Sequence, residues 1–470
     1  MRILVAIASY GVQNVRFLHR LLTEYRSMPY EVDIVVLSDA PKDLGPNVEV
    51  KVGLPTSDPW SLPFGHKRIF ADRLNEYDLF IYSEDDTLIT EKNIRAYLRM
   101  CNVLPEDEIA GFLRFEEGNG GPTNYCDVHG WYHWDPRSVR SRSGYVFAFF
   151  TNEHAACYLL TRKQLEHAIA SGSFLREPSQ GKYDLACTAA TDPYTQCFKK
   201  MICISHLDDF LIHHLPNKYV GVLGVREPEF RKQIDALLDI EKGTRPSCQL
   251  LETETRLPSS KWSKNYYEPC RAEIRDLLPA SVKSVLSVGC GWGATESCLV
   301  DNGIRVTGIP LDAVISACAE ARGLEVVCGD LNTVKEKLSG QRFDCLVFSN
   351  VLHLVEDPPA FLSSFASWLV GGGKVISITP NLSRLPVSWK RIRSVEGFSD
   401  LGNYGKTGVH VTSPRVVQGW FKRIGMRVEK TVDVVPHWLQ VASRLTFGLG
   451  NPLLASELIT VAGRGETICS

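Results

Sequence analysis

Three consecutive carboxylates follow an apolar segment early in the chain. The segment is residues 77–82, and Glu84, Asp85 and Asp86 come after the serine that follows it. Carboxylate oxygens are hard ligands of the kind that Mg²⁺ and Mn²⁺ bind, and such an ion can neutralise a departing diphosphate. The triplet therefore predicts metal-assisted transfer from a nucleotide diphosphate. An acidic, solvated strand end is the alternative interpretation.

Polar residues after the preceding apolar runs suit the nucleotide part of such a donor. Ser9 and Tyr10 follow a first run, where small and polar side chains let a base approach. Asp39 ends a second run and offers a carboxylate to a uracil or a ribose. Arg68, in a basic stretch before the triplet, offers a cation to the phosphates. The predicted donor-binding residues are Ala8, Ser9, Tyr10, Asp39, Arg68 and Asp85.

A glycine-rich cluster lies past the middle of the chain. Gly289, Cys290, Gly291 and Gly293 follow an apolar run at 284–288 and precede a helix-like segment. A turn of this kind lets the backbone approach a ligand closely, and the spacing alone suits a dinucleotide as well as an adenosyl cofactor. Three later motifs narrow the choice. They are residues 329–331 after a third strand, 343–358 as a fourth strand with a polar exit, and 369–374 as a turn into a fifth strand.

The elements that must position these clusters alternate between strand-like and helix-like segments. This alternation runs through residues 1–222 and again through 264–470, which predicts two α/β domains with mostly parallel sheets. Ligands of such sheets bind beyond the carboxyl ends of the strands. Residues 223–263 contain more charge, Pro and Ser, and we interpret them as a linker. Residues 116–143, rich in Gly, Pro and aromatic residues, are expected to form a long irregular loop.

The bulk composition limits the classes of partner. A chain of 470 residues with 44% hydrophobic and 23% charged residues is typical of globular proteins with more than one domain. Its 52 Lys and Arg balance 54 Asp and Glu, which gives no electrostatic case for nucleic-acid binding. The 14 cysteines have no zinc-like spacing and are expected to be reduced thiols of a cytoplasmic protein. No transmembrane segment is predicted, and peripheral membrane association stays open.

The first domain resembles the GT-A fold glycosyltransferases over residues 1–222. The resemblance rests on the order of a strand ending in Ser-Tyr, a strand ending in Asp, a basic stretch, and a strand ending in Glu-Asp-Asp. It implies a nucleotide-sugar donor and Mn²⁺ or Mg²⁺ held by Glu84, Asp86 and a late histidine, His214. Glu84 replaces the first Asp of the family motif, so Asp86 is the firmer ligand. The resemblance also implies that Asp192 is the base that deprotonates the acceptor.

The second domain resembles the class I S-adenosylmethionine-dependent methyltransferases over residues 264–464. The resemblance implies a Rossmann-like, seven-stranded fold in which Gly289, Cys290, Gly291 and Gly293 hold the amino-acid part of the cofactor. Ser287 and Pro310 replace two acids that the family usually carries, and Asp312 could bind the ribose from a shifted turn. The remaining cofactor residues implied are Asp330 and Leu331 near the adenine and Asn350 at the cofactor face. A cofactor-free domain and a dehydrogenase are the alternatives.

Two histidines are candidates for deprotonating a methyl acceptor. His353 and His410 lie in segments where the resemblance places the substrate side, and histidine titrates near neutrality. Each could equally be a polar loop residue. The sequence thus predicts a bifunctional transferase that glycosylates and O-methylates a glycan or a small-molecule acceptor. In the alternative, one domain is catalytic and the other is a binding or scaffold module.

Overall fold

The chain folds into two compact units, which are described separately. The computed structural model describes residues 1–118, 121–395, 397–436, 439–440 and 450–464. The units are Met1–Lys242 and Gly243–Ser470. The expected linker at 223–263 is divided between them, because helix α6 (Glu227–Glu241) buries Phe230, Ile234 and Leu237 within the first unit. Tyr125 stacks on Phe230 with ring centroids 3.7 Å apart.

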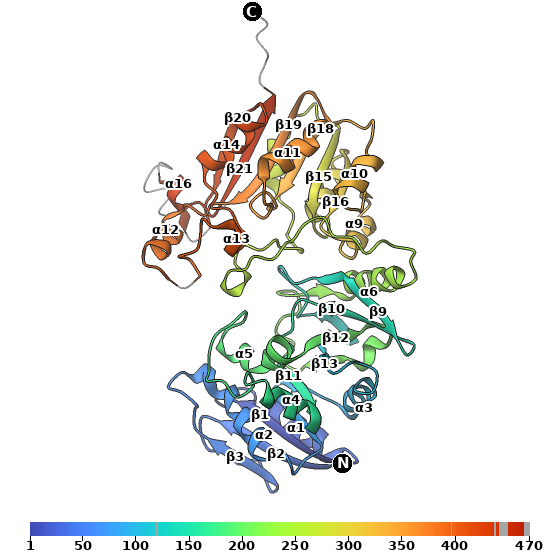
Figure 1. The fold of residues 1–470 in the computed structure, drawn as a ribbon, viewed down its shortest axis with the longest axis vertical. Coiled ribbons are helices and arrows are strands. Elements are labelled where there is room, and N and C mark those ends of the chain that lie inside the picture. The colour runs from blue at the N-terminus through green and yellow to red at the C-terminus, as the bar shows by residue number, and fades with distance from the viewer. Residues whose placement is uncertain (119–120, 396, 437–438, 441–449, 465–470) are drawn as a thin grey trace, which may run out of the picture. The chain divides into compact units, whose positions relative to one another are not determined.

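A five-stranded sheet begins the first unit (Figure 1). Its order is β11-β4-β1-β2-β3, with β1 to β4 parallel and β11 antiparallel to β4. The register aligns Ala8 with Glu84 and Ser9 with Ser38, so the residues after three strands meet at one edge of the sheet. The strands are β1 (Arg2–Ser9), β2 (Glu31–Ser38), β3 (Val48–Val52), β4 (Leu79–Glu84) and β11 (Cys157–Thr161). The helices of this region are α1 (Val15–Ser27), α2 (Gly65–Asp72), α3 (Glu91–Met100) and α4 (Arg162–Ala170).

Two smaller sheets complete the first unit. One has the order β6-β12-β10-β9 and the other β14-β8-β7-β13-β5. In the second, β13 pairs with β5 so that His214 lies opposite Thr87, the residue after Asp86. The strands are β5 (Thr87–Leu88), β6 (Glu108–Ala110), β7 (Leu113–Gly118), β8 (Gly121–Tyr125), β9 (Trp134–Arg142), β10 (Tyr145–Phe150), β12 (Lys199–Cys203), β13 (Leu211–His214) and β14 (Val225–Arg226). Helix α5 (Leu185–Asp192) lies between β11 and β12 in the chain.

The expectation of a long irregular loop at 116–143 is wrong. The described part of this segment contains the end of β7 and the whole of β8 and β9. Its aromatic residues form part of the interior: Tyr125 is fully buried, and Trp134 is 1% exposed and packs on Phe150. Gly118 and Gly121 are tolerated because they lie at strand ends, and Pro136 because β9 is an edge strand.

A seven-stranded sheet forms the centre of the second unit, as expected (Figure 1). Its order is β17-β16-β15-β18-β19-β21-β20, and β21 runs antiparallel to both neighbours. Strand β15 is buried at every position because helices cover a parallel sheet on both faces. The strands are β15 (Ser284–Cys290), β16 (Arg305–Pro310), β17 (Glu325–Val326), β18 (Phe343–Ser349), β19 (Leu369–Pro380), β20 (Met426–Val434) and β21 (Glu457–Arg464).

The helices of the second unit largely follow the expected alternation. Helix α7 (Ala272–Leu277) begins after Arg271, whose backbone amide donates to Thr295 Oγ1 at 3.0 Å. The other helices are α8 (Ala294–Asp301), α9 (Ser316–Ala321), α10 (Leu331–Lys337), α11 (Pro358–Ala366), α12 (Leu385–Ile392), α13 (Tyr404–Thr407), α14 (Pro414–Arg423) and α16 (Asn451–Leu454). Within the described ranges, no helix combines the length and apolarity needed to cross a membrane.

Candidate functional site

A cavity of about 470 Å³ lies beyond the carboxyl ends of β1 and β4. The three consecutive carboxylates Glu84, Asp85 and Asp86 line it. Aromatic side chains of Tyr10 and Trp60 also line it, and Lys218 is the basic residue of the lining. The combination of acidic, aromatic and basic side chains suits a diphosphate ligand that carries a ring and a divalent cation.

Asp85 is held by hydrogen bonds within the protein. Ser9 Oγ donates to its carboxylate at 2.6 Å and Asn14 Nδ2 donates at 2.8 Å. Lys42 Nζ donates in turn to the carbonyl of Ser9 at 2.6 Å. Burial raises the pKa of Asp85 despite these donors. Asp85 and Ser9, both expected to bind the donor directly, therefore also fix the loop that shapes the cavity.

Asp86 lies between an amide and an imidazole. Its Oδ2 is 3.2 Å from the donor Asn14 Nδ2 and 3.5 Å from His214 Nε2. Burial by itself would raise the pKa of Asp86, but contact with His214 lowers it below the usual value. Burial, followed by the charge of Asp86, raises the pKa of Glu84 to about 8. Crowded carboxylates beside an imidazole nitrogen are a donor set that fits a divalent cation, which would relieve their mutual repulsion.

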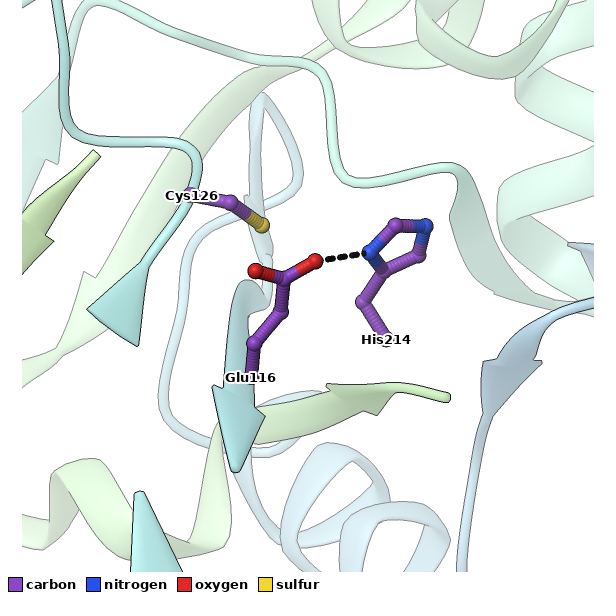
Figure 2. Close-up of side chains that lie close together, drawn as sticks. All are labelled: Glu116, Cys126 and His214. Carbon is purple, nitrogen blue, oxygen red and sulfur yellow. Dashed lines mark hydrogen bonds and ion pairs between the residues drawn. The ribbon is translucent and has the colours of Figure 1, made fainter. Parts of the chain in front are cut away.

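The expected metal ligand His214 is positioned by a residue that the sequence did not single out. Glu116 Oε1 accepts a hydrogen bond from His214 Nδ1 at 2.8 Å, and Cys126 lies beside the pair (Figure 2). All three side chains are buried. The Cys126 thiol donates to the carbonyl of Arg114 at 3.8 Å, and burial raises its pKa well above the usual value, so it stays a protonated thiol. Glu116 was not predicted as a site residue because it lies in the segment 116–143, which was interpreted as a loop.

Three other expected residues of the first unit have different surroundings. Asp192 forms a buried ion pair with Lys67 and lines a separate cavity of about 680 Å³, so it is not placed at the carboxylate cavity. Arg68 has a side chain 78% exposed and pairs with Asp72 at 3.0 Å, one helical turn away. Arg68 is not among the residues that line the carboxylate cavity, and its role at the phosphates stays a prediction. Asp39 accepts a hydrogen bond from the Gly11 amide at 2.8 Å, beside the cavity residue Tyr10.

The glycine loop of the second unit has the backbone geometry that its sequence indicated. Gly289 and Gly293 have φ of +74° and +83°, a region that favours glycine. Gly291 also has a packing role within the protein. A Cβ atom at Gly291 would lie 2.2 Å from the carbonyl oxygen of Tyr266, so the glycine makes room for this neighbouring segment of the chain. Its expected approach to the cofactor stays a prediction.

A glutamate on α8 supplies a carboxylate near the position where Ser287 replaces the usual acid. Ser287 Oγ donates to Glu296 Oε1 at 2.6 Å, and both side chains are buried. Burial raises the pKa of Glu296. Ser287 and Glu296 therefore form a buried hydrogen-bonded pair next to the glycine loop. The sequence motif alone does not predict this pair, because the two residues are nine positions apart.

The two aspartates expected at the cofactor's ribose and adenine cap local turns. Asp312 is 1% exposed and accepts hydrogen bonds from the amides of Val314 and Ile315 at 2.7 and 2.8 Å. Asp330 is exposed and begins α10, where it accepts from the Thr333 amide at 2.8 Å, with Leu331 as the first helical residue. These bonds orient both carboxylates.

A polar cavity of about 370 Å³ lies at the carboxyl end of β18. Asn350 lines it in a left-handed conformation with φ of +52°, and its Nδ2 donates to Glu268 and Glu457 at 3.0 Å each. Lys264 Nζ donates to Glu268 at 2.6 Å and to the carbonyl of Ser349 at 2.8 Å. Strain in a non-glycine residue that is fixed by two carboxylates is typical of functional sites. Glu268 was not identified from the sequence, although its spacing of four residues from Lys264 was visible.

The two candidate histidines differ in their access to this cavity. His353 lines it, and its Nε2 is 2.8 Å from the carbonyl oxygen of Trp262, so this nitrogen carries the proton. Burial lowers the pKa of His353 to about 4, which makes it a weak base. His410 Nε2 lies 3.0 Å from the carbonyl of Val355, and its ring stacks on Tyr404. His410 is thus engaged in loop contacts and is not among the lining residues of the cavity.

Comparisons with known proteins concern the second unit. Residues 262–431 match the family model described as a methyltransferase domain. A ubiquinone biosynthesis O-methyltransferase of Idiomarina loihiensis is 31% identical over 113 residues, which cover 23% of this chain and 45% of that protein. One of Xanthomonas axonopodis pv. citri is 28% identical over 162 residues, covering 33% of this chain and 66% of that protein. The chain therefore spans about half to two thirds of these curated relatives.

Solved methyltransferases also match the chain. An S-adenosylmethionine-dependent methyltransferase from Mesorhizobium loti has 21% identity and a TM-score of 0.31, covering 41% of this chain and 96% of its own. Magnesium protoporphyrin IX methyltransferase from Synechocystis PCC 6803 has 16% identity and a TM-score of 0.29, covering 41% and 78%. The family match confirms the resemblance of the second unit. Residues 262–431 are a methyltransferase domain of the class I, S-adenosylmethionine-dependent type.

Proposed function

We propose that the second unit transfers a methyl group from S-adenosylmethionine to an oxygen of a small-molecule or glycan acceptor. The match of residues 262–431 to a methyltransferase family is the observation that carries this proposal. The names of the matching relatives, which are O-methyltransferases, support oxygen as the acceptor atom. The cofactor supplies an electrophilic methyl group when it is bound.

The residues around the polar cavity have defined parts in this proposal. Asn350, held by Glu268 and Glu457, presents a polar side chain at the carboxyl end of β18, where the reacting groups meet. His353 keeps its proton on Nε2, so its Nδ1 can accept a hydrogen bond from the acceptor hydroxyl and orient it. The low pKa of His353 argues against full deprotonation before methyl transfer, so the hydroxyl proton would move to Nδ1 of His353 as the new oxygen–methyl bond forms, and from there to solvent.

Calorimetry with S-adenosylhomocysteine, the demethylated cofactor, tests the methyltransferase proposal. We expect the intact chain to bind it, and a ligand present at 100 times its Kd to stabilise the native state by about 2.7 kcal/mol. Absence of both heat and thermal stabilisation would show that the second unit is a cofactor-free module.

We also propose that the first unit transfers a sugar from a nucleotide-sugar donor with the help of Mn²⁺ or Mg²⁺. The observation that supports it is the presence of Glu84 and Asp86 in a cavity with aromatic and basic side chains, with His214 Nε2 3.5 Å from Asp86. Asp86 and His214 would hold the cation, and the cation would neutralise part of the negative charge of the diphosphate. Lys218 would face the negative charge that remains on the diphosphate. Tyr10 and Trp60 would flank the base. Since Asp192 is paired with Lys67, no acceptor base is assigned.

Substitution at Asp86 tests this second activity. Asp86→Asn keeps the shape of the side chain but removes the charge, so metal-dependent turnover of UDP-sugars should fall by at least about 100-fold, as for loss of a direct electrostatic contact. Asp72→Asn is the matched control, because the Asp72 side chain is 58% exposed and does not line the cavity. Turnover that resists EDTA, or equal activity of Asp86→Asn and the wild type, would contradict the proposal. Binding of the nucleotide without turnover would instead indicate a binding module.

A further inference from the structure

The carboxylate of Glu116 is surrounded by hydrogen-bond donors in the interior of the first unit. The side chain is fully buried. Its Oε1 accepts from His214 Nδ1 at 2.8 Å, and the Tyr219 amide donates to Oε1 and Oε2 at 3.1 and 3.0 Å. Asn124 Nδ2 donates to Oε2 at 3.2 Å. A buried carboxylate with donors on both oxygens is stabilised in one orientation, as Figure 2 shows for the side facing His214.

These contacts determine which nitrogen of His214 carries the proton. A carboxylate only accepts hydrogen bonds, so the proton of the imidazole must lie on Nδ1. When the imidazole carries a single proton, its lone pair is then on Nε2, and that atom is 3.5 Å from Asp86 Oδ2. A nitrogen lone pair and a carboxylate oxygen at this separation are two ligands that one divalent cation could share.

Backbone and ring contacts keep the imidazole in this place. The Leu215 amide donates to the carbonyl of Asp86 at 2.9 Å, which ties the end of β13 to the carboxylate segment. The ring of His214 stacks on Tyr219 with centroids 5.4 Å apart and planes inclined by 15°. Tyr219 thus contacts His214 through its ring and Glu116 through its amide, so the three residues form one rigid group.

We propose that Glu116 is a positioning residue that fixes the Nδ1-protonated tautomer of His214 and so presents Nε2 to a divalent cation shared with Asp86. This inference rests on the metal-dependent function proposed for the first unit. Glu116 is not itself the ligand, because both of its oxygens already accept hydrogen bonds. Carboxylate partners of metal-binding histidines orient the ring and raise the basicity of the ligating nitrogen. With one nitrogen ligand among oxygen ligands, the site should favour Mn²⁺ over Mg²⁺.

Glu116→Gln is the sharpest test because the amide has a defined orientation. Its oxygen should take the place of Oε2, where Asn124 and Tyr219 donate, and its NH₂ should then face His214 Nδ1. An NH₂ donor forces the proton of the ring onto Nε2 and removes the lone pair from the cation. We expect the Kd for Mn²⁺ alone, measured from free Mn²⁺ by electron paramagnetic resonance, to rise about 10- to 100-fold.

Glu117→Gln is the matched control. It makes the same substitution one residue further along β7, at a side chain 46% exposed whose Oε1 lies 4.0 Å from His213 Nδ1. We expect it to leave Mn²⁺ affinity unchanged. Mn²⁺ binding that is lost in Asp86→Asn is assigned to this site.

Long-range ¹H–¹⁵N NMR on histidine-labelled, metal-free protein gives a readout that does not depend on activity. We expect the His214 signal, identified by its loss in His214→Gln, to show a protonated Nδ1 in the wild type and a protonated Nε2 in Glu116→Gln. The wild-type spectrum tests the proposal even if Glu116→Gln does not fold.

The outcomes separate this inference from the proposed function. If the wild type binds Mn²⁺ through Asp86 but Glu116→Gln binds it equally well, the positioning role is wrong and the metal-dependent function stands. A wild-type His214 with its proton on Nε2 would also overturn the positioning role. If neither the wild type nor Asp86→Asn binds Mn²⁺, the proposed function of the first unit itself fails.

Discussion

At the scale of residues, both units surround their cavities with buried charged or polar side chains that satisfy one another. Asp85 is held by Ser9 and Asn14, and Asn350 is held by two glutamates. Such groups would be costly to bury without partners. The sequence predicted those cavity side chains that come just after a strand, such as Asp86 and Asn350. It did not predict Glu116 and Glu268, because these residues contact His214 and Asn350, which are distant in the sequence.

His353 gives a prediction for the acid stability of the second unit. Its pKa is about 4 in the folded protein because of burial, below the 6.5 of an exposed histidine. The unfolded chain therefore takes up this proton first as the pH falls, so stability is fully present above pH 6.5 and is lost toward pH 4. At about 1.4 kcal/mol per pKa unit the loss reaches at most about 3 kcal/mol.

The variant His353→Gln removes this titration and keeps a donor for the carbonyl of Trp262. Thermal unfolding followed between pH 4 and 7 should show a smaller acid-induced fall in Tm for the variant than for the wild type. Since His66 and His154 remain in both proteins, their titration cancels in the comparison. Parallel pH profiles for the two proteins would show that His353 is not buried as described.

At the scale of elements, the alternation of apolar and polar segments predicted most of the two parallel sheets. Strands such as β1, β4, β15 and β18 are buried along most of their length, and such strands form continuous apolar runs. Strands β7, β8 and β9 were missed, because their sequences combine polar residues, glycines and prolines and contain no such apolar run. The turn at the glycine loop was predicted, but its packing against the segment at Tyr266 was not, because that contact joins residues that no motif links.

Gly291→Ala tests the close packing of the glycine loop against the segment at Tyr266. The new Cβ would lie 2.2 Å from a backbone oxygen, which has little freedom to move. We expect a loss of about 1 to 3 kcal/mol, typical of overpacking, and a Tm lower by a few degrees for a unit of this size. S-adenosylhomocysteine affinity should fall with the displaced loop.

A glycine of the same unit with open surroundings provides the control for this substitution. A Cβ atom added at Gly371 would have no heavy atom within 4 Å beyond its chain neighbours, and the φ of Gly371 is not positive. Gly371→Ala should therefore leave both the Tm and the affinity unchanged. An equally mild effect at Gly291 would mean that the neighbouring segment moves away without cost.

At the scale of the whole molecule, the chain combines two units that each have their own sheet, core and cavity. Each consists of more than two hundred residues, Met1–Lys242 and Gly243–Ser470, which is enough for an independent hydrophobic core. A tether between two active sites raises the effective concentration of one near the product of the other. If one unit glycosylates an acceptor and the other methylates the same molecule, the tether would speed the second step by keeping the product near the second active site.

Division of the chain between Lys242 and Gly243 should give two folded fragments. The cut leaves α6 with the strands it packs against and leaves residues 243–263 with the second unit. We expect the first fragment to bind Mn²⁺ with a UDP-sugar and the second to bind S-adenosylhomocysteine, each with the affinity of the intact chain. Calorimetry on separately expressed fragments measures this. Fragments that fold only when they are expressed together would show that the units depend on each other for stability.

The pairing of β13 with β5 has a consequence for how the protein is made. His214 lies 98 residues after Glu116 in the chain, and both must be present before an imidazole can face Asp86. A ribosome therefore completes the strands β1 to β4 well before it has made the last ligand of the proposed ion site. The ion cannot act as a template for that sheet, whose apolar strands must assemble on their own. Metal scarcity during synthesis should then yield a chain of native shape that is loaded afterwards.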